Sequence, residues 1–227
     1  MKAKLVLCGV FVAGMVLFAA QPGVTGQITG SKHDFRTSSW GGGGASGQIC
    51  IACHANHKAD VSVVDAPLWN HTNSTVSYTL YTSATMDAGP SAQPGGLSKL
   101  CLSCHDGTVA LDSFGGATGT TFITNPAYSP KSNMGTALND DHPIGFIFDS
   151  TLATKDGALV DPSTPGVVIG SGAQTRTGTL AGMLLYSGKL ECSSCHDVHN
   201  TFTDDGGAKL VKISLTGSKL CLTCHKK

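Results

Sequence analysis

Four short segments of the chain share one arrangement of cysteine and histidine. Residues 50–54, 101–105, 192–196 and 221–225 each read Cys-x-x-Cys-His. This spacing lets two thiols form thioether bonds to the vinyl groups of one porphyrin, and the following His can then bind the iron. A zinc half-site, a thioredoxin-like thiol pair or a disulfide also uses Cys-x-x-Cys, but none of them needs a His directly afterwards. The pattern therefore predicts four covalently bound haems c.

Within each segment the cysteines and the histidine have different expected roles. We expect thioether bonds at Cys50, Cys53, Cys101, Cys104, Cys192, Cys195, Cys221 and Cys224. We expect the proximal iron ligands to be His54, His105, His196 and His225. The ninth cysteine, Cys8, lies in the N-terminal leader, so the four motifs use all the others and leave none for a disulfide.

Five histidines lie outside the motifs, and they are candidates for the sixth position of each iron. They are His33, His57, His71, His142 and His199. A second His closes the iron and is typical of an electron carrier, whereas an open iron can bind a small substrate such as nitrite or hydroxylamine. Because five candidates serve four irons, one of them is surplus or acts on a neighbouring subunit. We expect no catalytic residue.

His57 and His199 occupy equivalent places, each three residues after a proximal His. A side chain so near in sequence cannot easily reach the opposite face of the same porphyrin, so we expect each to bind a different haem. Which candidate is surplus stays open. The second half of the chain has no counterpart of His71, and this favours His71 as the surplus residue.

An internal duplication relates the motifs to one another. Residues 98–105 and 218–225 are identical at seven of eight positions, and residues 50–57 and 192–199 both read Cys-x-x-Cys-His-x-x-His. The sequence therefore predicts two tandem two-haem modules, at 27–110 and 135–227, joined by a segment rich in Gly, Thr and Pro.

The N-terminal 26 residues read as a secretory signal peptide. Lys2 and Lys4 precede an apolar run over residues 5–20, and small residues follow. Cleavage is expected after Gly26, with Ala20 as the alternative, and a retained membrane anchor is the competing interpretation. We therefore expect an exported protein without a transmembrane span after cleavage, located at the outer cell surface or, alternatively, in the periplasm.

The composition predicts an irregular fold and an acidic protein. The chain has 29 Gly and only 13% charged residues, and no long stretch keeps helical periodicity. We expect a mostly irregular multihaem fold with a haem-packed core, few short helices, which include turns starting near residues 99 and 219, and minor β-hairpins, with a strand at 166–170. Removal of Lys2 and Lys4 leaves 13 basic against 15 acidic residues. Haem propionates add negative charge, which excludes nucleic acid as a partner.

These features resemble the cytochromes with paired Cys-x-x-Cys-His motifs of metal-respiring bacteria. The resemblance covers nearly the whole mature chain, and it is carried by the motifs and by residues 32–34, 67–71, 105–108 and 141–144. Within this group the chain is similar to the four-haem outer-surface cytochromes of the OmcE type, which polymerise into extracellular filaments. The resemblance implies two His ligands on every iron, with His71 among them, and one sixth ligand donated by a neighbouring subunit.

The sequence thus predicts a low-potential electron-transfer cytochrome and not an enzyme. Expected partners are further copies in a head-to-tail polymer, other multihaem cytochromes as donors, and external electron acceptors. His57 and His33 are the candidates for the ligand that acts in trans, because both lie near the mature N-terminus. A soluble periplasmic shuttle is the alternative function, and a nitrite or hydroxylamine reductase is a third.

Overall fold

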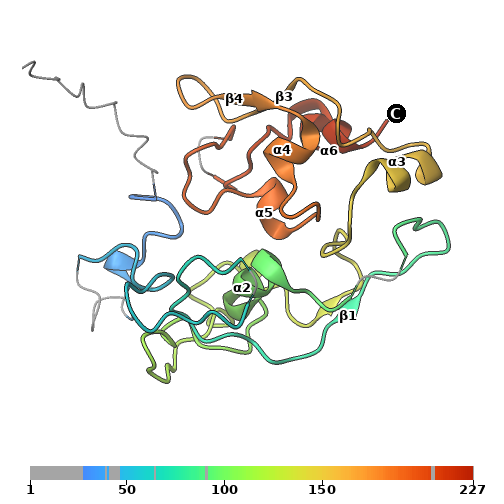
Figure 1. Ribbon diagram of the computed structural model, residues 1–227. Helices are drawn as coiled ribbons and strands as arrows, with labels where there is room; N and C mark the ends of the chain where they lie inside the picture. The colour runs from blue at the N-terminus through green and yellow to red at the C-terminus, as the bar shows by residue number, and fades with distance from the viewer. Residues whose placement is uncertain are drawn as a thin grey trace, which may run out of the picture.

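The structure is a computed structural model that describes residues 28–38, 40, 47–63, 65–89, 92–205 and 208–226 (Figure 1). The expected signal peptide and its cleavage sites lie outside these residues. Within them, no helix is both long enough and apolar enough to cross a membrane.

Short elements separated by long irregular segments make up the described chain. In order they are η1 (Phe35–Thr37), β1 (Thr79–Leu80), α2 (Gly96–His105), η2 (Pro130–Ser132), β2 (Ala137–Leu138), α3 (Ser150–Asp156), β3 (Val167–Ile169), β4 (Arg176–Gly178), α4 (Leu180–Leu184), α5 (Cys192–Cys195), η3 (Thr216–Ser218) and α6 (Lys219–Cys224). The longest of these, α2, has 10 residues. The helical turns expected near residues 99 and 219 are present in α2 and α6, while the haem-packed core stays a prediction.

The described chain has two small two-stranded sheets, one local hairpin and one that joins segments far apart in the sequence. Strands β3 and β4 form an antiparallel hairpin in which Val168 faces Thr177, and this confirms the strand expected at 166–170. Strands β1 and β2 are parallel, with Thr79 opposite Ala137. The second pairing places residues 137–138 against the first half of the chain, although the sequence assigns them to the second module.

The apolar core consists of several small clusters. The four clusters of buried side chains centre on Phe148 and Leu180, on Trp69 and Leu100, on Tyr78 and Leu102, and on Ile169 and Ile213. Helix α2 contributes to two of them, since Leu100 and Leu102 are both buried. The halves meet where α2 lies next to α5, as Figure 1 shows near the middle of the molecule. Both helices carry motif cysteines, so the contact between the halves brings two motifs together.

Candidate haem sites

One helical turn holds the two cysteines of each motif. In three motifs the His amide donates a hydrogen bond to the carbonyl of the first Cys, at 2.8 Å in residues 50–54, 3.1 Å in 192–196 and 2.9 Å in 221–225. The remaining motif forms the C-terminal turn of α2. Residues three positions apart on a helical turn lie on the same side. Both thiols of each motif are therefore presented to one ligand.

The motif cysteines have no disulfide partners in the described chain. Burial raises the pKa of the Cys53 thiol to about 11 and that of the Cys224 thiol to about 12. Burial also raises the pKa of Cys104 well above its ordinary value. These thiols are neutral at physiological pH, and their conversion to thioethers would bury no charge.

Thiols of successive motifs are neighbours in space. Three pairs of thiols are close enough to affect each other's pKa: Cys53 and Cys104, Cys101 and Cys192, and Cys195 and Cys224. The first motif thus adjoins the second, the second adjoins the third, and the third adjoins the fourth. The stacking of His54 on His199 also brings the first motif close to the third, so the sites lie near one another.

Backbone carbonyls orient the rings of three proximal histidines. The Nδ1–H group of His54 donates to the Pro67 carbonyl at 2.5 Å, that of His105 to Ser132 at 2.7 Å, and that of His196 to Lys209 at 2.9 Å. A carbonyl can only accept, so Nδ1 carries the proton and Nε2 keeps a lone pair for a metal. This hydrogen bond is the usual support of a metal-binding His.

Three proximal rings each face one of the spare histidines. The ring centroids are 6.1 Å apart for His54 and His199, 6.1 Å for His105 and His33, and 6.4 Å for His225 and His142. Imidazole nitrogens bind a metal at about 2.0–2.1 Å, so two rings on opposite sides of one iron have centroids about 6.3 Å apart. Aromatic rings that pack against each other without a metal also have centroids at this separation. The arrangement nevertheless fits a shared iron, because every pair joins one motif His to one spare His.

Two of the spare rings in these pairs, those of His33 and His142, present a ring nitrogen that could bind iron. Burial, followed by the charges of His105, His196 and His199, lowers the pKa of His33 to about 4. Its buried Nδ1 atom has no hydrogen-bond partner. In His142, Nδ1–H donates to the Pro143 carbonyl at 2.9 Å and leaves Nε2 available. The donor atoms present therefore fit haem iron at these sites.

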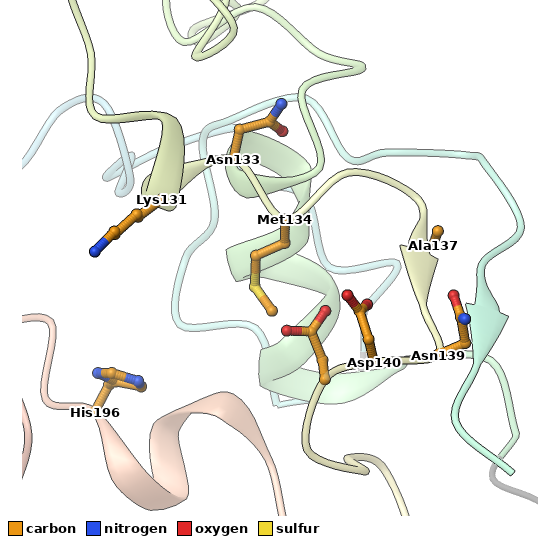
Figure 2. Close-up of a pocket in the computed structure, with 8 residues that line it drawn as sticks. Lys131, Asn133, Met134, Ala137, Asn139, Asp140 and His196 are labelled. Carbon is orange, nitrogen blue, oxygen red and sulfur yellow. The ribbon is translucent and has the colours of Figure 1, made fainter.

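The fourth proximal residue, His196, borders a cavity of about 610 Å³. Figure 2 shows its ring across the cavity from Met134 and Asp140. The described lining of this cavity contains no second His; its other residues are Lys131, Asn133, Ala137, Asn139 and Asp141. A haem held by His196 would therefore lack a His on its opposite side within one chain.

The two remaining histidines, His57 and His71, line a second cavity, of about 460 Å³. His57 is exposed. His71 is buried, and its Nδ1 and Nε2 atoms lie 2.8 Å from the Thr72 carbonyl and 3.0 Å from the Ala110 carbonyl. With a carbonyl at each nitrogen, the His71 ring directs no lone pair toward an iron in this arrangement. The expected ligand role of His71 stays a prediction. Among the spare histidines of the described chain, His57 alone is exposed and takes part in none of the three ring pairs.

No family model and no curated protein matches this chain. The resemblance to filament-forming cytochromes thus rests on the motifs and the short segments of the sequence named above. In the part of the chain that the structure describes, no three His, Cys, Asp or Glu side chains are grouped to hold a metal ion. A haem iron takes only two protein ligands, so the pairs described above would not form such a group.

Replacement of His71 by Gln tests whether it is surplus. We expect the H71Q holoprotein to keep four low-spin haems in electron paramagnetic resonance spectra. The free energy of unfolding should fall by about 1–3 kcal/mol, because one buried carbonyl loses its donor. A new high-spin signal in this variant would instead identify His71 as a ligand.

Proposed function

We propose that the chain is an electron-transfer tetrahaem c-type cytochrome with two His ligands on each iron. The three pairs of proximal and spare histidines carry this proposal. Closed irons favour electron transfer over substrate chemistry, and two His ligands give lower reduction potentials than one His with one Met. The bound haems would supply the one-electron iron couple.

The residues of the chain would fix the positions of the haems and control their surroundings. Motif cysteines attach each porphyrin, and carbonyls such as that of Pro67 orient the proximal rings. Contacts between successive motifs keep neighbouring sites close to each other, as the paired thiols of Cys101 and Cys192 indicate. The proposed role of the polypeptide is thus to set distances, potentials and solvent access.

Assembly into a filament is the second part of the proposal. The site at His196 has no His across its cavity, and His57 is exposed with no ring partner found for it. His57 of one subunit would complete the site at His196 in the next subunit. Such a head-to-tail contact continues indefinitely unless its rotation closes a ring. His33, the other candidate for this role, is partly buried and faces His105, which favours His57.

The same open position at His196 also favours a second candidate function. An iron without a sixth ligand can bind nitrite or hydroxylamine, so a monomeric form would have one site for reductase chemistry. A periplasmic shuttle would share the three closed sites and differ only in assembly. The two electron-transfer forms and the reductase can be separated by experiment.

Production of the exported protein in a host that matures c-type cytochromes provides the test. Intact-mass measurement is expected to show four covalent haems, and electron microscopy is expected to show filaments. A chain without covalent haem would contradict the cytochrome assignment. A monodisperse monomer with four low-spin six-coordinate haems would contradict the ligand in trans, and rapid nitrite turnover with one high-spin haem would favour the reductase.

A further inference from the structure

Glu191 is the only glutamate in the sequence, and it is buried at the junction between the two halves. Its exposed fraction is 4%. It directly precedes Cys192, where α5 begins, and it lies against the first turn of α2. Burial of a carboxylate destabilises the folded state unless the group accepts several hydrogen bonds. The hydrogen-bond donors around Glu191 therefore indicate its structural role.

Glu191 forms hydrogen bonds with both helices. On α2, the Ser98 amide donates to Oε2 at 3.2 Å, and the Ser98 hydroxyl also donates to this oxygen. On α5, Glu191 forms a capping box with Ser194, and the Ser194 amide donates to the Glu191 backbone carbonyl at 2.8 Å. Glu191 therefore contacts the first turns of two helices that carry motif cysteines, and on α2 its carboxylate accepts from an amide that has no partner within the helix.

Backbone amides at the start of α5 donate to serine hydroxyls and add to this junction. The Cys192 amide donates to the Ser98 hydroxyl at 3.0 Å, and the Glu191 amide donates to the Ser194 hydroxyl at 2.9 Å. The thiols of Cys101 and Cys192 lie close to each other beside these groups. The second and third motifs are thus joined at a single point.

In the described part of the chain, no lysine, arginine or histidine forms an ion pair with this carboxylate. The ion pairs found in the described residues involve other side chains. Lys212 is buried beside the third motif, where its amide donates to the Cys195 carbonyl, but its ammonium group donates to the Tyr186 hydroxyl at 2.8 Å. Buried charges are screened much less than surface charges, so the carboxylate acts strongly on groups beside it.

We propose that Glu191 is a positioning residue that holds the second and third haem sites together, and that its buried charge lowers the reduction potentials of these two haems. The proposal rests on the proposed function, since it requires haems on both motifs. An anion stabilises the more positive, oxidised iron relative to the reduced iron. The two inner haems are therefore held at lower potentials than their ligands alone would give.

The E191Q holoprotein tests this role, because Gln keeps the shape of the side chain and removes its charge. In a spectroelectrochemical titration, two of the four midpoints are expected to rise by about tenfold in the one-electron equilibrium constant, or ~59 mV each. The other two midpoints should stay in place. Thermal unfolding should also occur at a lower temperature, because the amide oxygen is a weaker acceptor for the donors on α2.

Two control variants distinguish charge from structure. Asp149→Asn removes another carboxylate that caps a helix, since Asp149 accepts from the Leu152 amide in α3 at 2.8 Å. This variant should lower thermal stability without moving the two midpoints. Glu191→Asp retains the charge and is expected to keep the two midpoints low. This variant tests the role of the charge even if the E191Q protein fails to accumulate.

The outcomes are separable from those of the cytochrome assignment. A wild-type protein without four haems would refute the proposed function before any variant is made. Four haems with unchanged midpoints in E191Q would overturn the role of Glu191 alone. Equal rises in E191Q and E191D would overturn it as well, because charge would then not be the cause.

Discussion

Replacement of His142 by Ala is expected to convert one haem in four from low spin to high spin. His142 faces the proximal His225 across 6.4 Å, and its side chain is exposed, so its loss removes a ligand without opening the core. The iron would then be five-coordinate or would bind water. Electron paramagnetic resonance and the visible spectrum of the oxidised protein measure this change.

His142→Met provides the matched control for this result. A thioether can replace imidazole as a ligand and raises the reduction potential, so H142M should keep four low-spin haems while one midpoint rises. Four low-spin haems in H142A with unchanged midpoints would show that His142 is not a ligand. The pairing of the His142 and His225 rings would then be aromatic packing alone.

Replacement of His57 by Ala is expected to abolish filaments and leave a monomer with one high-spin haem. The expectation follows from the cavity at His196, whose described lining contains no second His, and from the exposure of His57. Loss of one ligand bond at each contact should release every subunit, because assembly and ligation are then one event. Electron microscopy and sedimentation measure the assembly state, and electron paramagnetic resonance measures the spin state of the haems.

The H71Q variant is the control for this experiment, since His71 lines the same cavity but is buried. H71Q should form filaments with four low-spin haems. Filaments that persist in H57A with unchanged spectra would refute ligation in trans by His57. Addition of imidazole to the H57A monomer should restore the low-spin state by occupying the vacant position at His196.

The sequence predicts local features of this structure well. The repeated Ser-Lys-Leu before two motifs indicates helix, and α2 and α6 are found there. The β-branched run at residues 167–169 indicates a strand, and β3 forms it. In each case neighbouring residues determine the conformation, so a pattern in the sequence is sufficient.

Long-range relationships could not be predicted from the sequence. No pattern indicates that His199 faces His54, since the pairing depends on how the halves pack. The carbonyls of Pro67, Ser132 and Lys209 that orient proximal rings carry no side-chain signature. The sequence does carry one signal for Glu191, because it is the single glutamate of the chain and stands immediately before a motif cysteine.

The pairing of His54 with His199 links the order of synthesis to the order in which the sites are completed. His33 and His105 lie in the first half, and His142 and His225 lie in the second half, but His54 receives its partner from a residue 145 positions later in the numbering. In a chain exported from its N-terminus, the first motif to emerge would be among the last to acquire both ligands. A separately produced first half would carry an unfinished site, so the duplicated modules would mature only as a pair.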